Sequence, residues 1–358
     1  MIVRWCNGNT EVFGAFIQGS SPCRTTLATI PILPRVGIVV ANLSFMAAVK
    51  FFSGTATRYL AEKIVSGYGK ELGKVVIDRF SDGEISTYYA ESVRGYDVFL
   101  IQSTFPSSDN LMELLLLIDA AKRASAKYVT AVVPYFGYAR QDRKDKPRVA
   151  IGAKLVANLF SAAGADRLMT CDLHAGQIQG FFDFPVDHFS GSIIFVPYLK
   201  SIPQENLIFA SPDVGGVKRT RNFAQYFHTD MVICDKQRKR SNEVATMQVI
   251  GDVAGRDVVL VDDLVDTAGT LCKAAQVLKK EGARSVRAIS THAVLSGNAY
   301  ENIENSELEE LVVTDTIPLR QACSKIKVLS VAELFASAIK KIHKQESISP
   351  LFISKSRF

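Results

Sequence analysis

The chain has 358 residues, 47% of them hydrophobic and 22% charged, which is typical of a soluble globular protein with room for two domains. Its formal net charge of +6 is modest and spread along the chain, so it favours small anionic substrates over nucleic acid. The six cysteines are scattered without a C-x-x-C pair, which argues against a disulfide framework and a zinc-thiolate site.

Residues 1–45 differ in composition from the rest of the chain. They carry three arginines against a single acid, Glu11, and their apolar stretch at 36–45 is too short to span a membrane. One interpretation is an organelle transit peptide, because such peptides bear arginine and few acids. We prefer the interpretation that Met46 is the true start and that 1–45 is a mis-annotated, disordered extension. The protein is then expected in the cytoplasm.

Beyond residue 47, short apolar runs alternate with helical patterns. The first half predicts strands at 48–52, 74–79, 96–102, 128–134 and 167–171, and helices at 56–66, 110–125 and 149–162. The helix at 110–125 is expected to have Asp109 or Asn110 as its N-cap, and its leucines recur at helical spacing. The alternation predicts an α/β fold with mainly parallel sheets covered by helices on both faces.

The pattern restarts after the phenylalanine-rich segment 180–185. The second half predicts strands at 206–210, 230–234, 257–261, 286–291 and 310–314, and helices at 191–200, 214–227, 267–281 and 331–343. The two halves, 46–190 and 191–330, have the same layout and are expected to be separate domains. Because ligands of such sheets bind at the carboxyl ends of the strands, the site is expected between the halves.

The most informative stretch is 258–270, where an apolar strand is followed by three acids and then by small residues that open a helix. N–H groups of the small-residue loop and the positive end of the helix can hold a phosphate. The acids can face sugar hydroxyls or a metal, since carboxylates crowded at one strand end need such a partner. The alternative is an acidic N-cap with solvated neighbours. The residues concerned are Asp262, Asp263, Asp266, Thr267, Ala268, Gly269 and Thr270.

Two further features follow strand candidates. In the loop 211–216, Gly215 and Gly216 let the backbone approach an anion at a helix start, although the same residues also suit an ordinary turn. His174 follows the strand at 167–171 and could be a ligand for a metal that touches phosphate, or a donor to phosphate itself. A lone histidine is more often structural, so its local signal is weak.

Two basic runs and one turn complete the candidates. The run 140–148 lies beside aromatic residues and could bind a polyphosphate or stack on a base, but such runs are usually solvated loops. The run 235–242 could close over a substrate and neutralise transition-state charge, or it could be a nucleic-acid patch or a solubility feature. The turn 80–84 could stack on a purine, although a hairpin turn is the commoner explanation.

Taken together, these motifs closely resemble those of ribose-phosphate diphosphokinase, also called phosphoribosyl pyrophosphate synthetase, of the phosphate-dependent hexameric class. The match runs from about residue 51 to 352 and includes 80–84, 110–115, 138–142, 172–182, 211–216 and 258–270. The resemblance implies two Rossmann-like domains of the phosphoribosyltransferase type, with a C-terminal helix and tail at 331–358 packed on the first. It also implies transfer of the β,γ-diphosphoryl group of ATP to O1 of ribose 5-phosphate, with Mg²⁺, and release of AMP.

Roles carried over from the family fall on matching positions. The 5-phosphate is expected at 266–270, and the ribose hydroxyls or their magnesium at the two acids that precede it, Asp262 and Asp263. The pyrophosphate loop is expected at Asp213, Gly215 and Gly216, and the magnesium of ATP at His174 and Asp213. ATP contacts are expected from Arg140, Gln141 and Asp142, and from Phe80, Asp82 and Glu84 of a neighbouring subunit, which would require a homo-oligomer, expected to be a hexamer.

The remaining roles concern the transferred group and regulation. Lys236 and Arg238 resemble loop cations that act at the transferring group, and Gln237 stands where bacterial members commonly have Arg, which bears on loop affinity more than on chemistry. Six residues resemble a site for activating phosphate and inhibitory ADP, although hydroxyls and arginines bind an anion equally well without regulation. They are Ser92, Arg94, Arg148, Ser347, Ser349 and Phe352.

Two other functions are weighed against this one. A phosphoribosyltransferase would share the 258–270 loop, but the ATP-type segments at 80–84 and 140–142 and the doubled domain speak against it. A catalytically silent regulatory homologue is opposed by the presence of Lys236, Arg238, His174 and the acidic stretch. No nucleic-acid or membrane partner is expected.

Overall fold

The computed structural model of the chain describes residues 48–237 and 246–352. The leader expected at 1–45 and the loop cation Arg238 therefore lie outside the described residues. No helix within the described ranges is long and apolar enough to cross a membrane.

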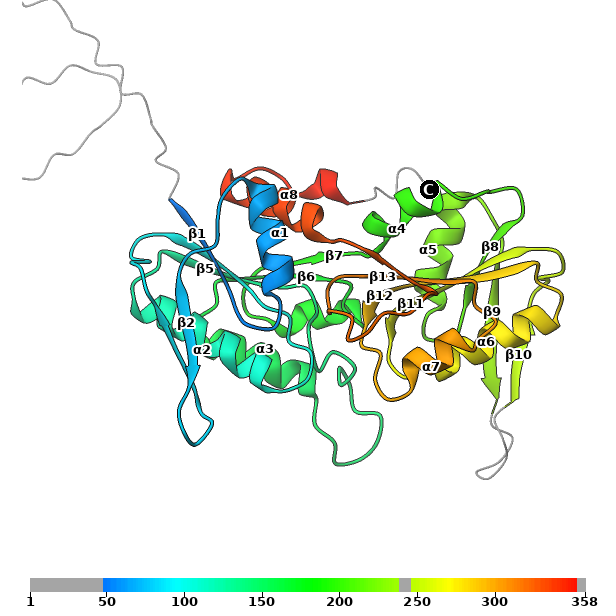
Figure 1. Ribbon diagram of the computed structural model, residues 1–358, viewed down its shortest axis with the longest axis horizontal. Helices are drawn as coiled ribbons and strands as arrows, with labels where there is room; N and C mark the ends of the chain where they lie inside the picture. The colour runs from blue at the N-terminus through cyan, green and yellow to red at the C-terminus, as the bar shows by residue number, and fades with distance from the viewer. Residues whose placement is uncertain (1–47, 238–245, 353–358) are drawn as a thin grey trace, which may run out of the picture. The chain divides into compact units, whose positions relative to one another are not determined.

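The first half of the chain forms a parallel five-stranded sheet (Figure 1). Its strand order is β1-β4-β5-β6-β7, and every neighbouring pair is parallel. The strands are β1 (Val49–Ser53), β4 (Asp97–Ile101), β5 (Tyr128–Val133), β6 (Arg167–Cys171) and β7 (Val186–Phe189), and the helices are α1 (Arg58–Tyr68), α2 (Asp109–Arg123) and α3 (Gly152–Ala163). A separate antiparallel hairpin joins β2 (Val75–Arg79) to β3 (Ile85–Tyr89).

The second half forms a seven-stranded sheet in the order β10-β9-β8-β11-β12-β13-β14, in which only the edge strand β10 is antiparallel to its neighbour. The strands are β8 (Leu207–Ser211), β9 (Met231–Gln237), β10 (Thr246–Ile250), β11 (Asp257–Val265), β12 (Ser285–Ala293), β13 (Glu310–Thr314) and β14 (Ile326–Leu329). The helices are α4 (Ser192–Leu199), α5 (Val217–Phe227), α6 (Gly269–Lys280) and α7 (Ala299–Glu304). The predicted class, parallel sheets flanked by helices, is confirmed.

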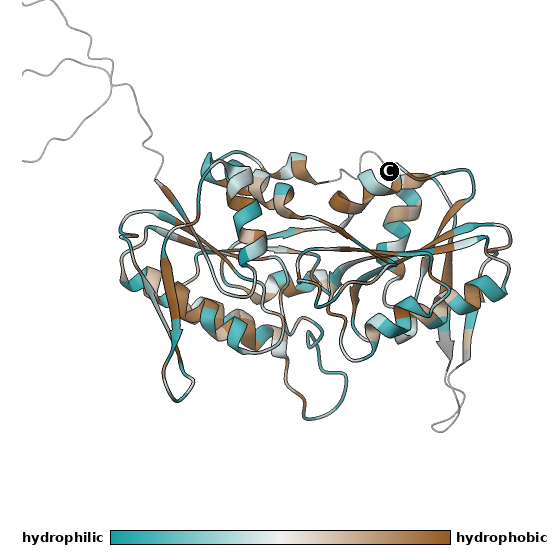
Figure 2. Cartoon of the chain, viewed as in Figure 1, coloured by the Kyte–Doolittle hydropathy of each residue, from teal (hydrophilic) through white to brown (hydrophobic). Residues whose placement is uncertain are grey.

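Both faces of each sheet are buried, because successive strand residues point to opposite faces and both faces carry helices. In β1, Phe51 packs in a cluster with residues of α1, whereas its neighbour Phe52 packs in a cluster with residues of α2. Figure 2 shows hydrophobic residues along the strands of both sheets and a mixture of hydrophilic and hydrophobic residues along the covering helices. This two-sided burial explains why the strands read as continuous apolar runs.

The last helix, α8 (Ala332–His343), packs against α1. Its side chains Phe335 and Ile339 are fully buried in the same cluster as Phe51. The Lys340 ammonium group donates a hydrogen bond of 2.8 Å to the carbonyl of Gly67, at the end of α1. A short 3₁₀ turn, η2 (Ser349–Leu351), follows this helix.

The strand order of the second sheet creates a switch point between β8 and β11. From β8 the chain proceeds to β9 and β10 on one side, whereas β11 and the later strands are added on the other side. The loop that follows β8 therefore lies beside the last residues of β11, and the loop that follows β11 begins a few residues farther along at the same carboxyl edge of the sheet. In open α/β sheets this crevice is the usual ligand site.

Several sequence predictions need correction in detail. The strand expected at 257–261 continues to Val265, so two of the acids lie inside β11 rather than after it. The N-cap of α2 is Ser108, not Asp109 or Asn110. The N-cap position of α6 is Ala268, with φ of 60°, which removes the alternative of an acidic cap by Asp266. The strands β3, β7, β10 and β14 and the helix α7 have no predicted counterpart.

An ion pair at the start of β11 makes stability depend on pH. Asp257 is buried and accepts hydrogen bonds from Arg284 and from the Ser285 hydroxyl group. The bond from Arg284 holds the pKa of Asp257 below its ordinary value, against the opposing effect of burial. Its contribution to stability is therefore present above the pKa of an unfolded aspartate, about 4, and is lost as the pH falls through the folded value.

We expect Asp257→Asn to lower the free energy of unfolding at pH 7, and the difference from the wild type to shrink steadily below about pH 4. Denaturant titrations at pH 7, 5 and 3 measure this difference. Asp230→Asn, which changes an exposed aspartate, is the matched control and should show little difference at any pH. A difference at Asp257 that stayed constant with pH would contradict the assigned ion pair.

Candidate active site

A pocket of about 220 Å³ opens at the carboxyl ends of β6, β8 and β11. Most of its lining comes from the stretch 262–271, and Arg140, His174 and Asp213 complete it. The first half of the chain thus supplies Arg140 and His174, and the second half supplies the acids and the small-residue loop. The structure brings these predicted site residues together from four separate segments of sequence.

Two polar residues, Ser296 and Asn302, form hydrogen bonds to the small-residue loop between β11 and α6. The N–H of Ser296 donates to the carbonyl of Asp266 at 3.0 Å, and its hydroxyl donates to the Asp266 carboxylate. The side-chain amide of Asn302 donates to the carbonyl of Thr267 at 3.0 Å. These contacts occupy carbonyls on the α7 side of the loop. Neither residue was singled out from the sequence.

The N–H groups of the same loop are left for a ligand. Within the described ranges, no N–H group from Thr267 to Leu271 donates a hydrogen bond. The first N–H groups of a helix have no partner inside it, and the helix dipole places positive potential there. An anionic group such as a phosphate fits this end of α6.

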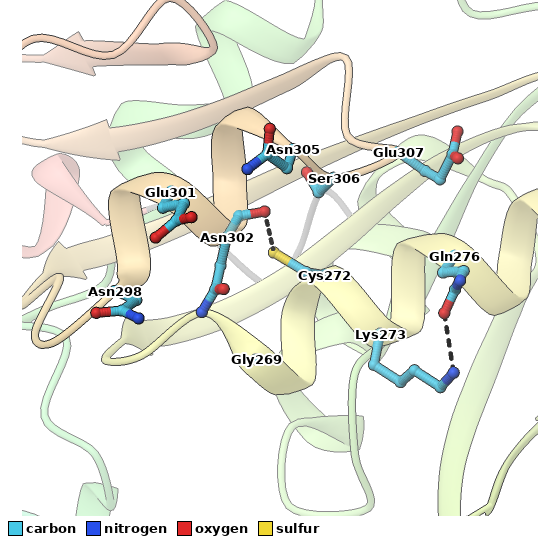
Figure 3. Close-up of a pocket in the computed structure, with 10 residues that line it drawn as sticks. All are labelled: Gly269, Cys272, Lys273, Gln276, Asn298, Glu301, Asn302, Asn305, Ser306 and Glu307. Atoms are coloured by element: carbon cyan, nitrogen blue, oxygen red, sulfur yellow. Dashed lines mark hydrogen bonds between the residues drawn. The ribbon is translucent and has the colours of Figure 1, made fainter.

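A second, open pocket lies on the other side of this loop, between α6 and α7 (Figure 3). It has a volume of about 460 Å³ and shares Gly269 with the first. In Figure 3, Asn302 lies between the two helices, and its carbonyl accepts a hydrogen bond of 3.4 Å from the Cys272 thiol. Apart from Gly269, no predicted site residue lines this pocket, and Asn302 links α7 to α6 and to the loop before it.

Asp262 and Asp263 form an adjacent acid pair at the end of β11. Burial and the neighbouring charge of Asp263 raise the pKa of Asp262 to about 8. Burial also opposes ionisation of Asp263, but a hydrogen bond from His174 and the charge of Arg219 hold its pKa well below the ordinary range. The pair therefore carries its negative charge on Asp263, and a further cation or a hydroxyl donor would favour ionisation of Asp262 as well.

His174 reaches across from the first half to this pair. Its ring Nδ1 lies 2.8 Å from Oδ2 of Asp263, and this hydrogen bond raises the pKa of His174 above its ordinary value. A histidine that shares its Nδ1 proton with a carboxylate has its Nε2 available for a ligand, the usual arrangement of metal-binding histidines. The hydrogen bond to Asp263 was not predicted from the sequence, and the magnesium site expected at His174 and Asp213 stays a prediction.

Arg219 of α5 is a site residue that sequence reasoning missed. Its guanidinium group donates a hydrogen bond of 2.9 Å to Oδ1 of Asp263 and lies 3.7 Å from Oδ1 of Asp172. Burial disfavours its charge, but the two carboxylates outweigh burial and raise the pKa of Arg219. The sequence contains only an indirect indication that such a residue exists. Several acids near one strand end require a cation, and the local motif does not contain one.

The loop after β8 is a compact turn at the start of α5. The Asp213 carboxylate accepts a hydrogen bond of 2.9 Å from the N–H of Gly216, and the Ser211 hydroxyl donates to the carbonyl of Asp213. A Cβ atom at Gly216 would lie 2.8 Å from the Ser211 hydroxyl oxygen, so this position favours glycine. Asp213 lines the pocket, whereas Gly215 and Gly216 do not.

The segment 140–142 lies at the rim. Arg140 forms an ion pair of 2.7 Å with Oδ2 of Asp266, and a hydrogen bond from Gln177 reaches Asp142. Gln141 accepts a hydrogen bond from the N–H of Ala153 through its carbonyl and lies outside the pocket lining. Of these three residues the structure therefore places Arg140 in the pocket.

The predicted adenine contacts lie at a hairpin away from this pocket. Phe80 is 59% exposed, and it lies in the turn between β2 and β3 with Asp82 and Glu84. The N–H of Glu84 donates to the Asp82 carboxylate at 3.1 Å. The turn predicted from the sequence is thus confirmed as a hairpin, but the role of these residues stays a prediction.

The predicted regulatory residues do not contact one another as one group. Ser92 accepts a hydrogen bond from the N–H of Arg94, and the Ser347 hydroxyl accepts one from the N–H of Ser349. Phe352 stacks on Phe189 with ring centroids 5.5 Å apart, so it also has a packing role. These residues fall into three places: Ser92 with Arg94, the exposed Arg148, and the C-terminal serines. Among the described residues, no hydrogen bond or ion pair links one of these places to another. Their role stays a prediction.

The side chains around the pocket offer few ligands for magnesium. No cluster of three or more His, Cys, Asp or Glu side chains in the described ranges is arranged to enclose a metal. Mg²⁺ is nevertheless usually held by one or two carboxylates together with substrate phosphates and water. Asp262 can be such a carboxylate. Its surroundings oppose its ionisation, and a nearby cation would favour it. The residues therefore fit a metal that arrives with a substrate.

Comparisons with known proteins identify the family of this chain. Residues 49–164 match the N-terminal domain of ribose phosphate pyrophosphokinase, and residues 209–353 match the phosphoribosyl synthetase-associated domain. A ribose-phosphate pyrophosphokinase of Porphyromonas gingivalis is 61% identical over 302 residues, which are 84% of this chain and 96% of the relative. One of Campylobacter jejuni is 56% identical over 309 residues, 86% and 100% of the two chains.

A solved structure has the same fold. The phosphoribosylpyrophosphate synthetase of Mycobacterium smegmatis superposes with a TM-score of 0.80 at 36% sequence identity, covering 83% of this chain and 99% of that one. The matched regions include both loops of the pocket and the segments that supply Arg140 and Asp213. The family resemblance expected from the motifs is therefore confirmed, and this chain belongs to the ribose-phosphate pyrophosphokinase family.

Proposed function

We propose that this enzyme transfers the β,γ-diphosphoryl group of ATP to O1 of ribose 5-phosphate, producing phosphoribosyl pyrophosphate and AMP. The observation that carries the proposal is the pairing of two anion-binding loops at one switch point. The 211–216 loop follows β8, the 266–270 loop follows β11, and these strands are adjacent. Two phosphorylated groups can therefore be held side by side.

Ribose 5-phosphate would occupy the β11 side of the pocket. Its 5-phosphate fits the free N–H groups from Thr267 to Leu271 at the start of α6. Its ring hydroxyls can then donate to the acid pair, since the ionised carboxylate of Asp263 accepts hydrogen bonds. Both contacts come from one rigid strand and one helix, which favours a fixed position for O1.

The diphosphoryl group would lie toward β8. In-line attack by O1 on the β-phosphorus needs little covalent help, so catalysis rests on positioning and on neutralising phosphate charge. Lys236 is expected to contribute a cation there. It lies in β9, three residues beyond the position paired with the last residue of β8. Arg238, the other expected cation, lies outside the described residues.

Magnesium would complete the charge balance. His174 and Asp213 would hold the magnesium of ATP, whereas Asp262 and Asp263 would bind the ribose hydroxyls or the magnesium bound there. When bound, it would neutralise phosphate charge and orient the diphosphoryl group. The residues of the chain would hold the acceptor sugar and exclude wrong orientations.

Assembly and regulation form a further part of the proposal. Phe80, Asp82 and Glu84 would reach the adenine of a neighbouring subunit, so the active form would be a homo-oligomer, expected to be a hexamer. Ser92, Arg94, Arg148, Ser347, Ser349 and Phe352 would form a site for activating phosphate and inhibitory ADP. We also propose domains at 46–190 and 191–330, a tail at 331–358 packed on the first domain, and a cytoplasmic location.

One assay tests the activity. The purified chain is incubated with ATP, ribose 5-phosphate and Mg²⁺, and AMP and the sugar product are measured by mass spectrometry. We expect equal amounts of AMP and phosphoribosyl pyrophosphate, and a rate that rises with added inorganic phosphate. Absence of AMP would indicate a silent homologue. In a separate incubation with phosphoribosyl pyrophosphate and a free base, consumption of both would indicate a phosphoribosyltransferase. A rate independent of phosphate would refute the regulatory site alone.

A further inference from the structure

Four charged groups from both halves of the chain form a continuous line of contacts, which begins at two residues in the wall of the pocket and continues behind it. The N-terminal half supplies Asp172 and His174, which follow β6, and the C-terminal half supplies Arg219 from α5 and Asp263 from β11. The contacts run from His174 to Asp263, from Asp263 to Arg219, and from Arg219 to Asp172. Arg219 is therefore the group that connects a carboxylate of one half to a carboxylate of the other.

The Asp172 end of this line is rigidly held. Asp172 has a φ of 48°, in the left-handed region, and its N–H donates a hydrogen bond of 2.7 Å to the carbonyl of Phe189. Its second carboxylate oxygen accepts a hydrogen bond from the Thr291 hydroxyl of the other half. A Cβ atom at Gly191 would lie 2.2 Å from the Thr291 hydroxyl oxygen, so the absence of a side chain there leaves room for this bond.

At the other end of the line, His174 and Asp263 face the ligand pocket. Asp263 is 4% exposed, and its two carboxylate oxygens have different partners, Arg219 on one and His174 on the other. A carboxylate with a partner on each oxygen has little freedom to rotate. The Arg219 side chain is itself only 21% exposed. Removal of one member would leave the others with uncompensated charge at a partly buried site.

We infer that Arg219 is a positioning residue for ribose 5-phosphate, which anchors Asp263 to Asp172 and so fixes the acid pair relative to the ATP side of the pocket. This inference rests on the proposed function for the identity of the ligand. Arg219 lies outside the lining of the pocket and is assigned no contact with either substrate. Its effect on the reaction passes through Asp263.

The guanidinium group is suited to this task in a way that an ammonium group is not. Arginine presents separate N–H groups in a planar fork, and here two different nitrogens face the two carboxylates. The lysine ammonium group is a compact point charge on a shorter side chain, so it lacks the rigid fork that reaches two separated carboxylates at once. Arg219→Lys therefore keeps the charge and removes the connection.

The test compares Arg219→Lys with Arg221→Lys in the full-length chain. Arg221 is exposed on the same helix and serves as the matched control. For Arg219→Lys we expect the KM for ribose 5-phosphate and its calorimetric Kd to rise about tenfold or more, the loss typical of a hydrogen bond to a charged group. The KM for ATP should change much less, and Arg221→Lys should match the wild type.

A purely structural role would give another pattern. It would lower thermal stability and kcat while leaving both KM values and the calorimetric Kd unchanged, and that result would overturn the inference. If Arg219→Lys fails to fold, Asp172→Asn tests the same connection from its other end and should also weaken ribose 5-phosphate binding. Normal binding by the folded Asp172→Asn variant would overturn it too.

Because binding of ribose 5-phosphate and formation of product are measured separately, the role of Arg219 and the proposed reaction can be refuted independently. A wild-type chain that binds ribose 5-phosphate without forming product would refute the proposed reaction, and the calorimetric comparison would still decide the role of Arg219. A wild-type chain that makes product, with an Arg219→Lys variant equal to it in both KM values and in Kd, would refute the role of Arg219 alone. A wild-type chain with no affinity for ribose 5-phosphate would refute both.

Discussion

Replacing Lys236 with alanine is expected to lower kcat by about 10²–10³, the usual cost of removing one group aimed at transition-state charge. The expectation rests on the chemistry of diphosphoryl transfer and on the backbone position of Lys236. It pairs with Met247, one position before the last pair of the β9–β10 ladder, beyond the register position of Ser211. The strand therefore extends past the edge where the 211–216 loop begins.

The measurement is steady-state formation of AMP with saturating ATP and ribose 5-phosphate. Binding of ribose 5-phosphate, followed by calorimetry, should change little, because its contacts come from β11 and α6. Lys280→Ala, which removes an exposed lysine at the end of α6, is the control and should retain the wild-type kcat. An unchanged kcat in Lys236→Ala would show that another group neutralises the transferring phosphate.

The second large effect is expected at Asp263. Asp263→Asn keeps the size of the side chain but removes the charge that both His174 and Arg219 contact. Leaving the cationic partner of a buried pair uncompensated is strongly destabilising, on the order of 3–5 kcal/mol. We therefore expect a lower thermal midpoint, and a fall of kcat/KM for ribose 5-phosphate by at least about a hundredfold, since binding and positioning are both lost.

A second readout distinguishes this explanation from general unfolding. Because the hydrogen bond to Asp263 is the main cause of the raised pKa of His174, the pKa should fall toward the ordinary histidine value in Asp263→Asn. NMR titration of the His174 ring protons measures it in the folded variant. Asp230→Asn, an exposed position, should leave the His174 titration and the kinetics unchanged. A folded Asp263→Asn with full activity would remove the acid pair from the proposed site.

Part of the site was predictable because its signals are local. In the 258–270 stretch, strand, acids, small residues and helix follow one another without a gap, so the strand, the loop and the helix start could be predicted from the order of residues alone. The structure refined only their boundaries, since β11 extends to Val265 and α6 begins at Gly269. The loop after β8 was predictable for the same reason.

Other parts were not predictable, because they depend on contacts between distant segments. Arg219 looks like an ordinary helix cation in the sequence, and its importance arises when the fold places it between Asp172 and Asp263, 47 and 44 residues away. His174 had a weak local signal, and its hydrogen bond to Asp263 could not be predicted because the two residues are 89 positions apart. The missed strand β7 has four residues, too short for a periodic pattern.

The sequence by itself determined that this protein is an α/β enzyme of the ribose-phosphate pyrophosphokinase family, with an acidic strand end followed by a small-residue loop that opens a helix. It did so because hydrophobic periodicity and motif order are properties of neighbouring residues. Only the tertiary structure decided that Asp263 is the acid of the pair that stays ionised, and that His174 and Arg219 are its partners. Burial, distance and local charge set those properties, and they exist only after the two halves of the chain pack against each other.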